Sequence, residues 1–249
     1  MPVKTDEKKQ HFDDIYVADT PVPYKTEILD KLEYISDTFN QRFFDRHILP
    51  WAQSQKERKL NFVDLCACFG NTTMATVYGM SYEAIRENWK DAESCQTIAA
   101  QRRFDCHTTA IDISAPAMAY GAKVGLYDTT IVKDLNDSSD EAIHAQVQQT
   151  MADADVFICT AALVYLDLET IETLISTFGK QEKEGYVMVN FLNPFSLEKA
   201  DATKQLLLKY LDFVGSMATR HRRMSPLEQE NYPGEEWALL ELWVLKRKS

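Results

Sequence analysis

Polar groups able to bind a nucleoside follow three successive apolar runs. The run at 61–67 ends in the turn CACFGNTT, where backbone amides before a helix favour a polar or anionic group. The second run ends at Asp112, whose carboxylate could accept two hydrogen bonds from a ribose diol. The third ends near Asp134, which could accept a hydrogen bond from an adenine amino group. Because the carboxyl ends of parallel strands meet at one crevice, these groups predict a single nucleoside site.

The two acids also have ordinary structural interpretations. Asp112 could cap a helix that begins at Ser114, and Asp134 could be a solvated loop acid. We favour the binding interpretation because the three run ends come in chain order and point to the same crevice.

The turn after the first run has one glycine and two cysteines. Gly70 permits a positive φ or a close backbone approach, and Asn71 and Thr72 are suitable caps for the following helix. On a strand, Cys66 and Cys68 would face the same side, so we expect buried thiols. We expect no metal, because no CxxC pair exists, and no disulfide, because residues i and i+2 of a strand pair poorly.

The elements that would position these groups alternate in pattern. Helical stretches separate apolar runs at 61–68, 107–113, 129–135, 154–160 and 185–192. This alternation predicts a parallel sheet covered by helices on both faces. Two last extended segments, 212–223 and 237–248, predict an antiparallel pair at the sheet edge. A helical pattern over about 24–49, ended by Pro50, precedes the first run.

Composition narrows the class of partner. The 249 residues are 45% hydrophobic, which suits one large globular domain with appendages. A net charge of −11 argues against nucleic acid and anionic membranes as partners. The polar start resembles no signal peptide, and no apolar run reaches the roughly 20 residues of a membrane span. We therefore expect a cytoplasmic protein with reduced cysteines.

These patterns resemble the class I S-adenosylmethionine (SAM)-dependent methyltransferases. DLCACFGN is similar to their first motif, acid-x-Gly-x-Gly-x-Gly, with Asp64 at the acidic position and Gly70 at the third glycine. AIDIS, VKDLND and DVFICTAALVYL are similar to the second, third and fourth motifs. The resemblance covers about 60–248, with a helical insertion expected around 81–104. It implies an α/β, doubly wound, mostly parallel seven-stranded sheet (a Rossmann-like methyltransferase fold) with a C-terminal antiparallel edge hairpin.

The resemblance also implies SAM as cofactor and S-adenosylhomocysteine as product. Tyr165 and Asn136 would act on the acceptor side as catalytic residues, and His221, among arginines, could serve as a base or bind a carboxylate. The aromatic rings before the first run would form a lid beside the sulfonium. The residues expected to bind the cofactor are Tyr16, Tyr24, Asp64, Cys66, Ala67, Gly70, Asn71, Thr72, Asp112, Ile113, Asp134, Leu135, Thr160 and Ala161.

We expect an N-terminal tail and helical cap over 1–58, with 1–14 mobile, and a SAM-binding domain over 59–249. The expected function is methylation of a small molecule, and the chain could form a homodimer. Two alternatives remain open. The altered turn could bend the methionine part, giving a cyclase or lyase that releases methylthioadenosine. The loss of two glycines could instead mark a non-catalytic cofactor-binding subunit.

Overall fold

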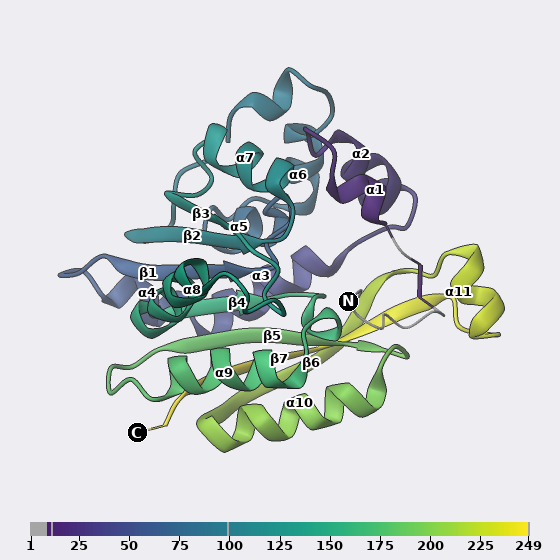
Figure 1. Ribbon diagram of the computed structural model, residues 1–249. Coiled ribbons are helices and arrows are strands. Elements are labelled where there is room, and N and C mark those ends of the chain that lie inside the picture. Colours follow the sequence, from purple (N-terminus) through teal and green to yellow (C-terminus); the bar gives the residue numbers. More distant parts are fainter. Residues whose placement is uncertain (1–8, 11, 99, 249) are drawn as a thin grey trace.

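Seven strands form one sheet in the order β3-β2-β1-β4-β5-β7-β6 (Figure 1). The computed structural model describes residues 9, 10, 12–98 and 100–248. β1 to β5 pair in parallel, and β7 lies antiparallel between β5 and β6. The strands are β1 Leu60–Leu65, β2 Cys106–Asp112, β3 Thr129–Val132, β4 Val156–Cys159, β5 Tyr186–Asn193, β6 Leu211–Arg223 and β7 Trp237–Arg247. The predicted fold class and its edge hairpin are confirmed.

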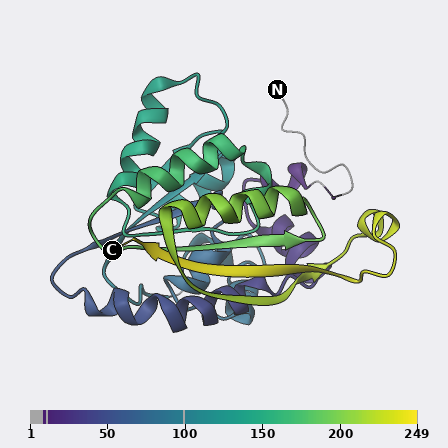
Figure 2. The ribbon, with the colours of Figure 1, turned by 90° about the horizontal axis from the view of Figure 1, so that it is seen from below.

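Two apolar cores, one on each face of the sheet, follow from the alternation of side chains along the strands. In β1, Phe62 packs into one core, whereas Val63 and Leu65 pack into the other. Figure 2 shows α9 and α10 on one side of the sheet. The helices after β1 are α5 Asn71–Thr76, α6 Tyr82–Asn88, α7 Ala115–Lys123, α8 Glu141–Asp153, α9 Leu168–Gly179, α10 Leu197–Tyr210 and α11 Pro226–Asn231. The 3-10 turns are η2 Ser94–Gln96 and η3 Leu163–Tyr165. The predicted insertion around 81–104 holds α6 and η2.

The helix predicted over 24–49 is wrong as a single element. It is divided among α2 Val22–Tyr24, the π-helix η1 Lys25–Asp30 and α3 Ser36–His47, with α1 Asp13–Tyr16 before them and α4 Leu49–Ser54 after. Glu33 adopts a left-handed φ of 47°, which ends the helical turn before α3. The adjoining backbone bonds to β6 instead, through Arg223 N to Leu32 O and Ile35 N to His221 O. Pro50 lies in the first turn of α4 rather than ending a helix, because its ring suits a first turn.

The start of the chain also differs from the prediction. Residues 1–8 and 11 lie outside the described residues. Lys9, however, is 7% exposed, and Asp13–Tyr16 form a helix, so a mobile tail does not describe these positions. None of the helices in the described ranges is long and apolar enough to cross a membrane. The division of the chain into 1–58 and 59–249 stays a prediction.

Candidate cofactor and acceptor site

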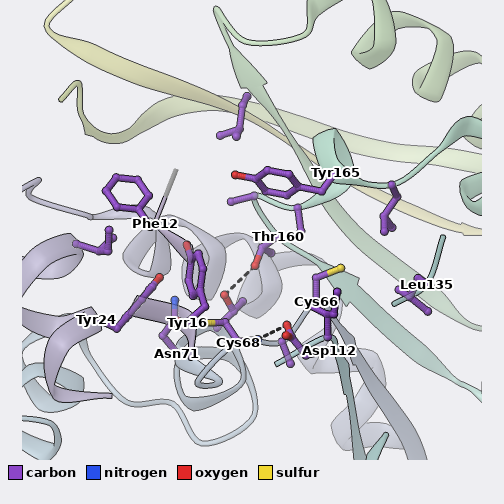
Figure 3. Close-up of a pocket in the computed structure, with 18 of the residues that line it drawn as sticks. Phe12, Tyr16, Tyr24, Cys66, Cys68, Asn71, Asp112, Leu135, Thr160 and Tyr165 are labelled. Atoms are coloured by element: carbon purple, nitrogen blue, oxygen red, sulfur yellow. Dashed lines mark hydrogen bonds between the residues drawn. The ribbon is translucent and has the colours of Figure 1, made fainter. Parts of the chain in front are cut away.

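A cavity of about 440 Å³ opens at the carboxyl ends of β1 to β4, beside the N-terminal segment (Figure 3). Its volume falls within the range of roughly 300–1,000 Å³ that is usual for small-molecule sites. The residues predicted to bind a cofactor or to act in catalysis line this cavity, except Asp64 and Gly70. Those on the cavity wall are Tyr16, Tyr24, Cys66, Ala67, Asn71, Thr72, Asp112, Ile113, Asp134, Leu135, Asn136, Thr160, Ala161 and Tyr165.

The turn after β1 repeats a left-handed backbone at every second residue. Cys66, Cys68 and Gly70 have φ of 56°, 50° and 84°. β1 ends at Leu65, so the prediction that both cysteines continue the strand is wrong. Residues other than glycine rarely adopt such φ values, at a cost of about 1–3 kcal/mol each. The two cysteines therefore hold left-handed backbone conformations that glycine would adopt without this strain.

Asp64 and Gly70 shape this turn from behind the cavity. A Cβ on Gly70 would lie 2.3 Å from Leu126 Cδ2 and 2.7 Å from the Tyr127 hydroxyl, so close packing requires glycine. Asp64 accepts hydrogen bonds from Thr73 Oγ1 at 2.6 Å and from the Tyr127 hydroxyl at 2.8 Å. Burial raises the pKa of Asp64 to about 7. Asp64 thus ties the turn and α5 to Tyr127, whereas a direct contact with a cofactor stays a prediction.

Asp112 is held at the end of β2 by the backbone of the same turn. Its two carboxylate oxygens accept hydrogen bonds from Cys68 N at 2.8 Å and Ser114 N at 2.7 Å. Burial raises its pKa, against the lowering effect of these bonds. The side chain of Ser114, not Asp112, caps α7, so the capping interpretation of Asp112 is wrong. An ionised carboxylate has about four acceptor positions, which leaves about two for a ligand diol.

Apolar side chains flank Asp112 where a base could lie. Ile113 is 67% exposed, which is unusual for a large aliphatic side chain, and Leu135 is on the same cavity wall. Asp134 Oδ1 accepts a hydrogen bond from Asn136 N at 3.0 Å, which braces the loop after β3. This contact fits the structural role of Asp134 as a loop acid, and it leaves Oδ2 available to a ligand.

Asn136 uses its side-chain amide to hold the loop that carries Tyr165. Its Nδ2 donates to Tyr165 O at 2.9 Å, and its Oδ1 accepts from Asp167 N at 2.8 Å. Across the cavity floor, Thr72 and Thr160 share a hydrogen bond of 2.9 Å. Ala161, with a left-handed φ of 57°, donates its N–H to Asn190 at 2.6 Å. The loop after β4 is therefore fixed on both sides.

The N-terminal segment covers the cavity with aromatic rings. Tyr16 and Tyr24 have ring centroids 6.0 Å apart, and Tyr24 also packs 6.1 Å from Phe69. The hydroxyl of Ser114 donates to the carbonyl of Tyr16, which anchors the segment to the start of α7. Burial raises the pKa of both tyrosines, so their hydroxyls stay neutral. Such rings suit a cationic ligand, as predicted for the lid.

A cationic group occupies the end of the cavity away from Asp112. The ammonium of Lys9 contacts the Tyr165 hydroxyl and lies 4.9 Å from the centre of that ring. No carboxylate of the described chain lies within ion-pair distance of it. Arg222, in contrast, is neutralised by two hydrogen bonds of 2.7 Å to Glu228, itself fully buried. Lys9 thus contributes a positive charge that has no ion-pair partner among the described residues.

A β-bulge brings His221 to the same wall. β6 and β7 lose register between Arg220 and Arg222, so His221 and Arg222 both line the cavity instead of alternating between faces. The His221 ring packs edge-on to Tyr34, with centroids 4.9 Å apart, and its Nδ1 lies 2.5 Å from Ser36 Oγ. Burial, and then the charges of Arg222 and Lys9, lower the pKa of His221, so its imidazole is neutral.

The cysteines do not form a reactive or metal-binding cluster. The pKa of Cys66 is raised by its contact with the Cys159 thiol and by burial, and burial raises that of Cys68. The thiols are therefore protonated and weak nucleophiles. All five cysteines are free, and no group of three His, Cys, Asp or Glu side chains in the described part of the chain could hold a metal ion.

Several wall residues escaped the sequence prediction. The RHRR run at 220–223 indicated a basic cluster, but strand alternation would have placed His221 and Arg222 on opposite faces. Nothing in the polar start of the chain marked Lys9. The wall residues that sequence reasoning missed include Lys9, Phe12, Ile28, Tyr34, Lys133, Leu192 and Arg222.

The chain matches no protein-family profile and no curated protein sequence. Similar solved structures include a SAM-dependent methyltransferase from Archaeoglobus fulgidus, at 12% identity and a TM-score of 0.48, over 90% of this chain and 98% of that one. Magnesium protoporphyrin IX methyltransferase from Synechocystis PCC 6803, with bound SAM, has 11% identity and a TM-score of 0.44 over 84% and 79%. Geranyl diphosphate C-methyltransferase from Streptomyces coelicolor A3(2) has 12% identity and a TM-score of 0.41, over 82% of this chain and 81% of that one. At identities this low, the similarities say nothing of substrate or activity.

Proposed function

We propose that this protein is a SAM-dependent methyltransferase that acts on a small molecule. The observation that carries the proposal is Asp112, fixed by the backbone of a left-handed turn at the end of β2. In a sheet of this strand order, ligands bind beyond the carboxyl ends of the strands, near the point where the order reverses. That point lies between β1 and β4, and the cavity opens there.

The residues present fit an adenosine-bearing ligand. The free acceptor positions of Asp112 suit a ribose diol, and Ile113 and Leu135 offer apolar surface to a base. The charged amino-acid end would lie beside Asn71 and Thr72, which line the cavity and donate hydrogen bonds of 2.8 and 3.1 Å to the buried carboxylate of Asp37. Bound SAM would supply an electrophilic methyl group on sulfur.

The chain's own residues would contribute mainly alignment. Displacement at a methyl carbon depends on holding the two reactants in line, and it needs a base only if the acceptor must lose a proton. Tyr16 and Tyr24 would exclude water above the sulfonium. Asn136 would act by positioning the loop of Tyr165 rather than by touching the substrate, because its amide is engaged with backbone groups.

Calorimetric titration with SAM and with S-adenosylhomocysteine tests the cofactor. We expect both to bind to the wild-type protein, and Asp112→Asn to weaken both. The matched control is Asp105→Asn, an exposed acid just before the other end of the same strand, which should bind as the wild type does. Folded wild-type protein that binds neither ligand at millimolar concentration would end the proposal.

Product analysis separates methyl transfer from the lyase or cyclase reaction. The side chains of Cys66 and Cys68 line the cavity beside the turn, where glycine would leave open space for the methionine part. Incubation of enzyme with SAM alone should yield no methylthioadenosine above the enzyme-free control. Enzyme-dependent methylthioadenosine would favour the alternative reaction.

A further inference from the structure

The end of the cavity away from Asp112, where an acceptor would bind, combines a neutral imidazole, an ammonium with no ion-pair partner among the described residues, and aromatic walls. His221 and Lys9 both line the cavity, although 212 positions separate them in the chain. Figure 3 shows the rings of Phe12 and Tyr165 on the side of the cavity away from Asp112, with the Tyr16 ring between them and the turn of Cys68. The function proposed above leaves the acceptor and any base unassigned, so these groups need an account of their own.

The contacts of His221 indicate which ring nitrogen carries hydrogen. Ser36 Oγ lies 2.5 Å from Nδ1 and 3.3 Å from the His221 carbonyl oxygen. A hydroxyl has one proton and a carbonyl only accepts, so both contacts are hydrogen bonds only if Ser36 donates to the carbonyl and Nδ1–H donates to Ser36. Nε2 then carries a free lone pair. No hydrogen-bond partner for Nε2 exists among the residues that the structure describes.

We propose that His221 Nε2 accepts the proton of a phenol-like substrate, whose oxygen binds beside Lys9 at the Tyr165 end of the cavity. This inference rests on the proposed methyltransferase function and assigns its substrate class. In the step, the substrate O–H bond breaks and its proton bonds to Nε2. The oxygen lone pair forms the new bond to the methyl carbon, and the C–S bond breaks with its electron pair kept on sulfur.

The surroundings favour a phenol over other acceptors. An ammonium substrate would be repelled by the positive charge of Lys9, and a carboxylate is already ionised at neutral pH and needs no base. A phenolic hydroxyl must lose its proton, and the resulting anion is stabilised by Lys9. The apolar sides of Phe12, Leu192 and Tyr165 suit a flat ring.

The charged groups around His221 keep it ready for this role. Lys9 and Arg222 face it, and Glu228 balances Arg222. Tyr34 packs on the ring, and Ser36 fixes Nδ1. Burial and these cations lower the pKa of His221, which keeps Nε2 unprotonated at neutral pH.

The test compares substituted phenols of graded acidity as acceptors. In His221→Gln, the methylation rate of phenol itself should fall by about 10² or more, the usual contribution of a general base. The loss for para-nitrophenol should be at least about tenfold smaller, because much of that compound is already ionised at the assay pH. His144→Gln, a histidine on α8 outside the cavity wall, is the matched control and should leave both rates unchanged.

Equal losses for both phenols would show that His221 is structural and would overturn the proposal. So would a SAM-binding wild-type enzyme that methylates only amines or thiols, or that methylates neither phenol. Failure to bind SAM would instead remove the underlying methyltransferase function.

The tautomer of His221 provides a readout that needs neither cofactor nor acceptor. In ¹⁵N-edited ring spectra of the wild-type protein, the His221 signals should show Nδ1–H and a bare Nε2. Their assignment comes from their loss in His221→Gln or, if that variant does not fold, from their shift in Ser36→Ala. An Nε2–H tautomer would contradict the proposal.

Discussion

The two ends of the cavity are built from opposite chemistry. The proposed cofactor end has two buried acids, Asp112 on the cavity wall and Asp64 behind it, whose pKa values burial raises. The acceptor end gathers Lys9, Arg222 and a histidine whose pKa burial lowers. The first end comes mostly from the strand ends within 62–161, whereas the second joins residues near the two ends of the chain. One site therefore contains a part defined by local sequence and a part that exists only after folding.

The largest expected difference between the two ends is the sign of their pH dependence. Asp64 has a pKa raised from 3.8 to about 7, so the folded protein holds this proton more tightly than the unfolded chain does. Its contribution to stability is present below about pH 4 and is lost as the pH rises to about 7. A shift of roughly three units corresponds to on the order of 4 kcal/mol. In urea unfolding, the stability of Asp64→Asn should therefore fall less than that of the wild type as the pH rises from about 4 to about 7.

Other buried acids also contribute to the pH dependence of stability, so Asp64→Asn needs controls. Burial also raises the pKa of Asp37, to about 6, and that of Asp112, so the variant keeps a smaller slope of the same sign. The exposed Asp105→Asn should keep the wild-type slope. A slope in Asp64→Asn equal to that of the wild type would mean that this carboxyl is ionised in the folded protein.

His221 should show the opposite dependence. Its pKa is lowered below 6.5, so its contribution is present above about pH 6.5 and is lost as the pH falls through the folded-state pKa. In His221→Gln, the unfolding free energy should decline less than that of the wild type on acidification. Urea unfolding below about pH 6.5 measures this. If the variant and the wild type lose stability equally on acidification, the imidazole is already charged in the folded protein.

Binding measurements separate the two ends directly. Asp112→Asn should weaken binding of S-adenosylhomocysteine by about a hundredfold or more, because two hydrogen bonds to a charged group contribute roughly 1.5–3 kcal/mol each. Affinity for para-nitrophenol, followed by the absorbance of its anion, should change far less. If Asp112→Asn loses affinity for both ligands to a similar extent, the two ends form one coupled site.

Lys9→Met should give the reverse pattern with a smaller effect. Loss of a charge-assisted contact should weaken binding of the nitrophenol anion by about tenfold, and S-adenosylhomocysteine should bind nearly as before. Met keeps much of the buried side-chain volume. Lys123→Met, on α7 outside the cavity wall, is the matched control. Retention of anion affinity in Lys9→Met would contradict the cationic acceptor end.

The smallest expected effect concerns the strained turn. Cys68→Gly relieves a left-handed residue, and after the entropy cost of glycine the protein should gain about 1 kcal/mol of stability. Ala67→Gly is the control within the same turn, because Ala67 does not have a positive φ, and it should lose about 0.5–1 kcal/mol. Thermal unfolding ranks the two. If both variants are destabilised, the packing of the Cys68 thiol stabilises the protein by more than the backbone strain destabilises it.

Much of the cofactor end could be predicted because its geometry is local. Apolar runs and the residues that follow them placed Asp112, Leu135 and Thr160 at strand ends, and parallel pairing brought those ends together. The same reasoning failed at Cys66 and Cys68, because it continued the strand beyond Leu65, where the turn begins. Where a strand stops depends on its partners. β1 pairs with β2 and β4 only as far as Leu65.

The sequence alone determined the order of the elements, the edge hairpin and the acid that faces the crevice, because alternation and polarity act over a few neighbouring residues. Tertiary structure decided the acceptor end. The contact of Lys9 with Tyr165 and that of Ser36 with His221 join segments more than 150 positions apart. Such contacts arise only when the sheet closes against the N-terminal segment, so no local pattern records them.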